Sequence, residues 1–185
     1  MGLNRAILDK YEFAEMAENP NTPLHMLIKL SKDDSWMVRY HVAKNSSTSA
    51  SILNKLSYDD NNNIRMGVAE NPNTPIKTLN RLSKDKFLRY YVARNPAIPV
   101  KLSVELSNDD DWLVRIGVAE NRYTSTKLLV KLSTDNDYSV RMKVSVNPST
   151  PLETIMAMII ENNEVIKWVK GNPNPKIIKM VNKLE

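Results

Sequence analysis

The sequence predicts an all-α protein, a right-handed two-layer α-solenoid of about six to seven helix–turn–helix repeats, each of about 26 residues. Two observations carry this prediction. An asparagine-led turn recurs along the whole chain, and all ten prolines fall inside these turns. The segments between the turns have apolar residues at helical spacing but are too short to bury their own apolar faces. The repeats must therefore stack on one another.

The turn reads Asn-Pro-Asn-Thr-Pro at residues 19–23 and again at residues 71–75. Proline lacks a backbone N–H and disfavours helix in the residue before it. We therefore expect one helix to stop at the asparagine, in the left-handed conformation. The next helix should start with the threonine as N-cap and the proline as its first residue. Weaker copies of the turn begin at Asn45, Asn95, Asn121, Asn147 and Asn172.

Each repeat consists of a first helix, a short Asp/Asn/Ser loop and a second helix. In the first full repeat these helices are expected at 23–32 and 36–44. The whole chain, 1–185, is predicted to be a single repeat domain. It divides into an N-terminal capping helix in 1–18, the repeats in 19–171 and a C-terminal half-repeat cap in 172–185.

One arginine recurs in the second helices, in a column formed by Arg39, Arg65, Arg89, Arg115 and Arg141. At about 100° per residue, Arg39 lies between Val42 and Ala43 on the inward face of its helix. Because inward arginines need partners, we expect a structural ladder of bidentate arginine–carboxylate pairs to the Asp-rich loops. Phosphate binding by this column is the less favoured alternative.

The opposite face of the second helices is unusually apolar and aromatic, and it should line the concave surface of the solenoid. Patches of this kind mark partner sites, and Tyr, Trp, Met and Arg are enriched at interface centres. Gly67 and Gly117 should leave notches in it. Two alternatives stay open: curvature buries this face as core, or the face self-associates. The candidate partner-binding residues are Tyr40, His41, Met66, Phe87, Tyr90, Tyr91, Arg94, Leu113, Ile116, Met142 and Trp168.

Three aromatic residues occupy the start of second helices, at Trp36, Trp112 and Tyr138. We expect them to fill the space beside the loop between the helices rather than to stack on nucleic-acid bases. At the other end of these helices the charge alternates from repeat to repeat, as in Lys44, Glu70 and Arg94. That alternation predicts pairing between neighbouring repeats and interrupts any continuous basic track.

With these columns in place, the chain resembles the leucine-rich repeat variant family and, more loosely, HEAT repeats. The stretch "VAENPNTPLHMLIKLSKDDSWMVRYHVAKN" combines its elements, which recur over roughly residues 16–175. The resemblance implies the fold, a bacterial source and little about activity. Some members carry an N-terminal cysteine cluster that holds iron–sulfur. This chain has no cysteine, so that role is not carried over.

Composition excludes several classes of function. Without cysteine there are no disulfides, thiol catalysis or cysteine zinc sites, and no metal-ligand cluster, phosphate loop or nucleophile motif is present. We expect no catalytic residues, no cofactor, no membrane partner and a cytoplasmic location. The net charge of +5 is compatible with an acidic partner but too small to imply one.

Three functions remain. The first is a non-enzymatic scaffold, a monomer or weak homo-oligomer, that binds a protein or peptide. The second is nucleic-acid binding, as in the alkylpurine DNA glycosylases built on HEAT-like repeats, which combine a basic concave cleft with a catalytic aspartate. Here every aspartate candidate belongs to the repeating loops. The third is structural self-association. We favour the first.

Overall fold

The computed structural model describes residues 11–183, and these residues form helices and turns without a β-strand. Residues 11–18 are helical, and pairs of short helices follow. The first member of each pair is here called an A helix: α2 (Leu24–Leu30), α4 (Ala50–Leu56), α6 (Ile76–Leu82), α8 (Val100–Leu106), α10 (Thr126–Leu132), α12 (Leu152–Glu161) and α14 (Pro175–Val181). The second member is a B helix: α3 (Trp36–Lys44), α5 (Asn62–Glu70), α7 (Arg89–Arg94), α9 (Trp112–Glu120), α11 (Tyr138–Val146) and α13 (Val165–Val169).

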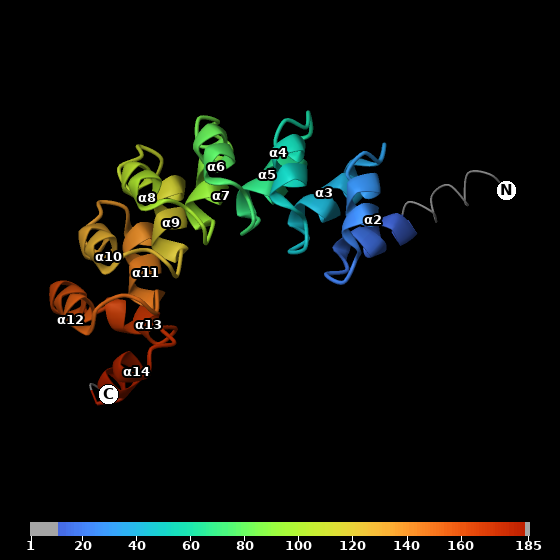
Figure 1. Ribbon diagram of the computed structural model, residues 1–185. Helices are drawn as coiled ribbons and strands as arrows, with labels where there is room; N and C mark the ends of the chain where they lie inside the picture. The colour runs from blue at the N-terminus through green and yellow to red at the C-terminus, as the bar shows by residue number, and fades with distance from the viewer. Residues whose placement is uncertain (1–10, 184–185) are drawn as a thin grey trace. The chain divides into compact units, whose positions relative to one another are not determined.

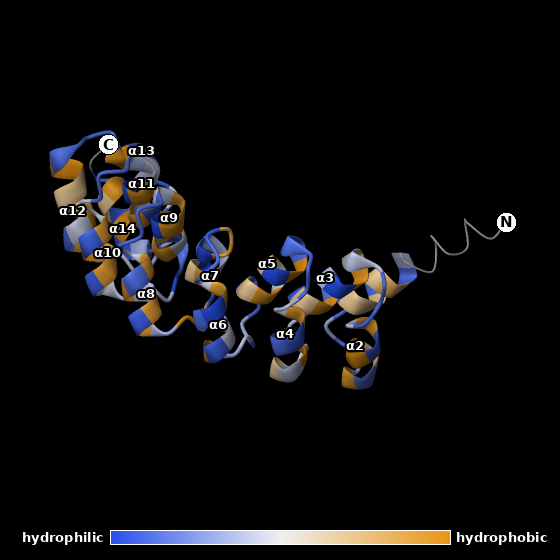
Figure 2. Ribbon diagram, turned by 90° about the horizontal axis from the view of Figure 1, so that it is seen from above, coloured by the Kyte–Doolittle hydropathy of each residue, from blue (hydrophilic) through white to orange (hydrophobic). Residues whose placement is uncertain are grey.

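The chain forms two compact units, Met1–Ala97 and Ile98–Glu185, and each is a run of such pairs. In the first unit the helix pairs follow one another in chain order (Figure 1), with α2, α4 and α6 along one side and α3, α5 and α7 along the other (Figure 2). In the second unit α9, α11 and α13 pack in succession. The predicted all-α fold of stacked helix pairs is therefore confirmed, while the single-domain organisation stays a prediction.

The two predicted caps are only partly described. Residues 11–18 of the N-terminal capping segment are helical, and residues 1–10 of that prediction lie outside the described residues. The C-terminal half-repeat cap contains α14, and residues 184–185 lie outside.

The core of each unit is built from the repeated apolar columns. The A helices contribute leucines such as Leu27, Leu53 and Leu79, and the B helices contribute valines such as Val42 and Val68; all of them have no exposed surface. Hydrophobic and hydrophilic residues alternate along the helices (Figure 2). Burying one such side chain contributes about 1.5–3 kcal/mol, so the stacked columns hold the repeats together.

The asparagine that opens each turn does not adopt the expected left-handed conformation. Asn71 ends α5 with φ −70° and ψ 126°, and no described residue other than glycine has positive φ. Its side chain instead bridges the repeats: Nδ2 donates to the carbonyls of Ala43 (2.7 Å) and Asn45 (2.9 Å). Its Oδ1 accepts the N–H of Asn73 at 2.9 Å. Asparagine is therefore required for its amide group, because a carboxylate cannot donate these bonds.

The same amide contacts recur along both units and form an asparagine ladder. In every described case, Nδ2 donates to two carbonyls of the preceding turn. The residues that make these contacts are Asn45, Asn71 and Asn95 in the first unit and Asn147 and Asn172 in the second.

The threonine of the turn is not the N-cap that the sequence suggested. In α6 the N-cap is Pro75, whose ψ of 143° is not helical, and the helix begins at Ile76. The Thr74 hydroxyl instead donates to the carbonyl of Val68, at 2.6 Å, six residues earlier. The hydroxyl therefore satisfies the C-terminal turn of the preceding helix, which has carbonyls without helical partners.

The third repeat is shorter than its neighbours, because its asparagines are 24 residues apart rather than 26. Its B helix α7 has six residues, against nine in α3 and α5. Phe87 therefore lies in the turn before α7 and not on the helix, and its side chain is 78% exposed. Within residues 11–183, no helix has the length and apolar character needed to cross a membrane.

Candidate functional site

The arginine column contacts the loops between A and B helices. Arg39 donates from Nε to Asp59 Oδ2 (2.7 Å) and from Nη2 to Asp59 Oδ1 (3.2 Å). Its Nη1 donates to the backbone carbonyls of Asp33 and Asp34. The guanidinium thus joins its own loop to the loop of the next repeat. We call this arrangement the arginine clasp.

A matching clasp occurs in the second unit. Arg115 donates to both carboxylate oxygens of Asp135, at 2.7 and 2.9 Å, and Nη1 donates to the carbonyls of Asp109 and Asp110. The two side chains are 12% and 8% exposed. Such buried, bidentate, charge-assisted contacts are stronger than exposed ion pairs.

The other arginines of the column differ from these two. Arg65 keeps the backbone contacts to Asp59 and Asp60, but its Nη2 lies 3.7 Å from Asp85 Oδ2, beyond hydrogen-bond distance. The Nη2 of Arg65 donates instead to the side-chain oxygen of Asn62. Arg89 lies half-buried at the first position of α7. Arg141 contacts its own loop through backbone carbonyls.

The clasp lowers the pKa of both of its carboxyl groups. Burial raises the pKa of Asp135, but hydrogen bonds from Arg115 and from the backbone N–H of Asp137 outweigh it. The same balance, with Arg39 and Asn61, leaves the pKa of Asp59 below its ordinary value. The carboxylates of Asp59 and Asp135 are therefore ionised at neutral pH, and both are held by hydrogen bonds to an arginine.

The candidate partner-binding residues of the first unit lie on neighbouring B helices. Tyr40, His41, Met66, Tyr90 and Tyr91 are all half-buried, on α3, α5 and α7, which pack in order. We call this surface, together with Arg94, the B-helix face. These side chains are half-buried, so curvature does not close the face as core; self-association through it stays a prediction.

A hollow of about 530 Å³ opens at the N-terminal end of the B-helix face. Tyr40 and His41 line it, with Glu18 from the end of the preceding helix and Pro20 from the turn that follows that helix. His41 Nδ1 lies 3.9 Å from the Glu18 carboxylate. The hollow therefore combines an aromatic wall with one acidic and one imidazole group.

At the other end of the face three side chains form one group. The rings of Tyr90 and Tyr91 meet edge to face, with their centroids 5.2 Å apart. The Arg94 guanidinium carbon lies 5.4 Å from the Tyr90 ring centroid. Tyrosine and arginine side chains present large, amphipathic surfaces, as found at interface centres.

Gly67 does not form the expected notch. The residue is buried, and a Cβ built there would lie 3.2 Å from the Cβ of Ala43 and 3.5 Å from the Tyr40 ring. Glycine at this position lets α3 and α5 approach closely, and the Tyr40 ring covers it. Gly117 is buried as well.

The charges that alternate along the ends of the B helices pair as expected. Glu70 lies 2.7 Å from the Lys44 ammonium and 3.6 Å from the Arg94 guanidinium. In the second unit Lys143 pairs with Glu120 at 2.6 Å. Lys44 and Arg94, next to the B-helix face, therefore share the single negative charge of Glu70.

In the second unit the B helices carry the remaining candidates. Leu113 is 45% exposed, and Met142 and Trp168 are half-buried. Ile116 is only 6% exposed, so its assignment to an open surface is wrong. Ile116 stands at the register of Tyr40 in α3, and its shorter side chain is buried where the tyrosine is half-buried.

The aromatic residues at the start of B helices do not fill the space beside the loop. Trp36, Trp112 and Tyr138 are 48%, 43% and 57% exposed. The Tyr138 ring lies 5.9 Å from that of Trp168 on the next B helix. The sequence analysis did not predict this pair, although it had named Tyr138 among the aromatic residues that start B helices and Trp168 among the partner-binding candidates.

Comparisons with known proteins support the fold. No protein-family model matches the chain, and no curated protein sequence matches it at a significant level. A solved structure described as a leucine-rich repeat variant with a novel repetitive structural motif aligns with a TM-score of 0.50 and 22% identity. The alignment covers 86% of this chain and 70% of the other. The chain has the leucine-rich repeat variant fold.

The leucine-rich repeat variant fold does not by itself imply a function, so a function has to be argued from the individual site residues. Among the described residues, no three His, Asp or Glu side chains gather in an arrangement that could hold a metal ion. The features of this variant-repeat chain that differ between repeats are the B-helix face and the ends of the arginine column.

Proposed function

We propose that this protein is a non-enzymatic scaffold that binds a protein or peptide on the B-helix face. The observation that carries the proposal is the half-buried aromatic group of Tyr90 and Tyr91, held edge to face beside Arg94. The backbone framework repeats, but the side chains at these two positions vary: they are Tyr40 and His41 in α3 and Met66 and Gly67 in α5. Residues that vary on a repeated framework are free to specify a partner.

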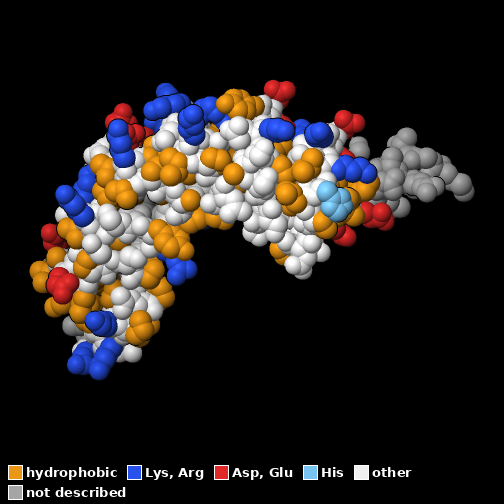
Figure 3. All heavy atoms as spheres, in the orientation of Figure 1, with side chains coloured by type: hydrophobic (Ala, Val, Ile, Leu, Met, Phe, Trp, Pro, Cys, Tyr) orange, Lys and Arg blue, Asp and Glu red, His pale blue; other side chains and the backbone are white. Residues whose placement is uncertain are grey.

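The charges beside this face favour a protein partner over nucleic acid. Phosphate binding needs cations that are available to replace counterions. Here Lys44 and Arg94 both lie against Glu70, so its carboxylate offsets part of their charge. On the face shown in Figure 3, hydrophobic side chains interrupt the lysines and arginines, and no continuous basic track appears.

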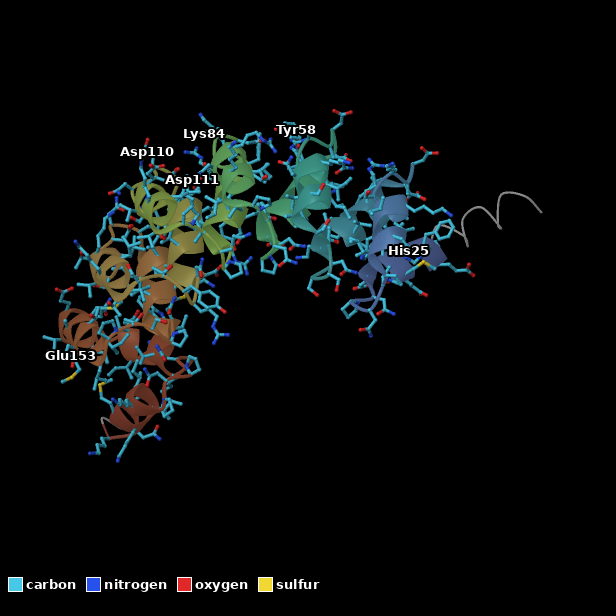
Figure 4. All side chains as sticks on the ribbon, viewed as in Figure 1. His25, Tyr58, Lys84, Asp110, Asp111 and Glu153 are labelled. Atoms are coloured by element: carbon cyan, nitrogen blue, oxygen red, sulfur yellow. The ribbon has the colours of Figure 1, made fainter. Side chains whose placement is uncertain are left out.

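The experiment compares three forms of the protein by affinity capture from cells that express it. The test variant is Tyr90→Ala/Tyr91→Ala. The control is Tyr58→Ala, which removes a 65%-exposed tyrosine at the outer end of α4, away from the B helices (Figure 4). Thermal unfolding of all three forms verifies that the variants are folded at the capture temperature.

The proposal expects a protein that wild type and Tyr58→Ala retain and that the double variant loses. Direct binding of that protein, purified, must then show the same order of affinity. Retention by all three forms would contradict the proposal. Capture of nucleic acid that salt removes would favour the nucleic-acid alternative, and a concentration-dependent mass of the pure protein, lost in the double variant, would favour self-association.

A further inference from the structure

The last loop of the second unit departs from the pattern of the arginine clasp. In the earlier loops an aspartate accepts, through Oδ1, the backbone N–H two residues later; Asp59 and Asp135 do so and also receive the arginine of the preceding repeat. In the loop after α12 the turn position is held by Asn162, whose Oδ1 accepts the N–H of Glu164 at 2.9 Å. A neutral amide thus stands where the clasp requires a carboxylate.

The arginine that faces this loop is Arg141. Its Nη1 donates to the carbonyls of Asp135 (2.6 Å) and Asn136 (3.0 Å), as Arg115 does in the preceding repeat. In Arg115 the remaining edge, Nε and Nη2, binds a carboxylate. Within residues 11–183 the corresponding edge of Arg141 makes no hydrogen bond or ion pair. Arg141 is half-buried and anchored, with its donor edge available.

A pocket of about 370 Å³ lies at this point, wholly within the second unit. Arg141 lines it together with Asn162, Glu161 and Thr134, and Met158 and Val165 supply apolar walls. Since the oxygen of Asn162 is occupied by the turn, its amide nitrogen remains as a further donor. The pocket therefore offers a pre-positioned guanidinium, an amide and an apolar lining.

The charges around the pocket select the ligand. Asp135 and Glu161 are both acidic, and only Asp135 is neutralised, by Arg115. A doubly charged phosphate would face these carboxylates with one free cation beside it. A single carboxylate has one charge and two oxygens at the spacing that the clasp already binds in this chain.

We propose that the Arg141 pocket binds a single carboxylate group, carried by an acidic side chain or by the C-terminus of a peptide. The bound carboxylate accepts from Nε and Nη2 of Arg141, as Asp59 accepts from Arg39 and Asp135 from Arg115. This site does not depend on the proposed function of the B-helix face, which lies on other residues.

The test follows the arginine Nε–H and asparagine side-chain N–H resonances of the protein by NMR during titration with small carboxylates. Asn162 then reports binding when Arg141 is replaced, and Arg141 reports it when Asn162 is replaced. N-acetylaspartate amide carries a side-chain carboxylate, N-acetylalanine carries a C-terminal one, and inorganic phosphate is the competing anion. Two variants are compared with wild type. Arg141→Gln removes the donor edge, and Asn162→Asp supplies the missing carboxylate without disturbing the turn, which aspartate makes in the other loops.

The proposal expects a saturable shift of the Arg141 resonance with at least one carboxylate and weaker binding of phosphate. Both variants should bind the carboxylate about tenfold more weakly or worse, because each removes the charge-assisted pair. Asn162→Asp should also be at least as stable as wild type, which shows that its loss of binding is not unfolding. Equal binding by Asn162→Asp, tighter binding of phosphate, or no saturable shift would each overturn the proposal.

Discussion

Replacing Asn71 with alanine tests the asparagine ladder at a central rung. The Asn71 side chain is 2% exposed and makes three hydrogen bonds, two as donor to Ala43 and Asn45 and one as acceptor from Asn73. Each such bond contributes about 1 kcal/mol net. Asn71→Ala should therefore lower the free energy of unfolding by about 3 kcal/mol, since it also leaves two carbonyls without their donor.

The assay is urea denaturation followed by far-UV circular dichroism, with Asn80→Ala as the matched control. Asn80 is exposed on α6, where alanine is the better helix former, so this variant should stay within about 0.5 kcal/mol of wild type. A loss below about 1 kcal/mol for Asn71→Ala would refute the view that the amide bonds hold neighbouring repeats together.

Asn71→Asp sharpens the same test. The aspartate keeps the acceptor but directs a carboxylate at two carbonyl oxygens, so its pKa in the folded state should lie above its unfolded value of about 3.9. The protonated form then favours folding, and the penalty grows as pH rises through that value. Compared with Asn71→Ala at each pH, Asn71→Asp should be relatively less stable at pH 7 than at pH 3; an unchanged difference would contradict the geometry.

Three further predictions concern other contacts. Asp135→Asn should lose about 2 kcal/mol at pH 7; because Arg115 keeps the pKa of Asp135 low, this loss should shrink as pH falls below about 4, and denaturation at both pH values checks it. Thr74→Val removes the bond to the Val68 carbonyl and should cost about 1–1.5 kcal/mol by urea denaturation, against no change if the hydroxyl were idle. Gly67→Val should cost about 2 kcal/mol or more, since even a Cβ would lie 3.2 Å from a neighbouring Cβ, and a thermal midpoint equal to wild type would contradict the close approach of α3 and α5.

The sequence predicted the series of helix pairs because the signals that start and stop each helix are local. Proline can stop a helix wherever it stands, and the leucine and valine columns follow from helical spacing alone. The bidentate contact between Arg39 and Asp59 was also foreseeable, because the angle of Arg39 on its helix points it toward the loops.

What the sequence could not give depends on contacts between repeats. Asn71 was interpreted as a left-handed helix stop, because its bonds to Ala43 and Asn45 reach about one repeat back along the chain. Gly67 was interpreted as a notch because the sequence of neither helix determines the distance between α3 and α5. Ile116 and Trp112 were misplaced for the same reason, since exposure of a B-helix side chain depends on the helix beside it.

The central claim, that the B-helix face is where this protein meets a protein partner, is tested most directly by site-specific photo-crosslinking in cells that express it. A photoreactive phenylalanine replaces Tyr91 in one strain and Tyr58 in another; Tyr58 is the more exposed of the two. The account predicts a discrete crosslinked protein from position 91 and none from position 58. Crosslinks from position 58 alone, or the same products from both positions, would contradict it.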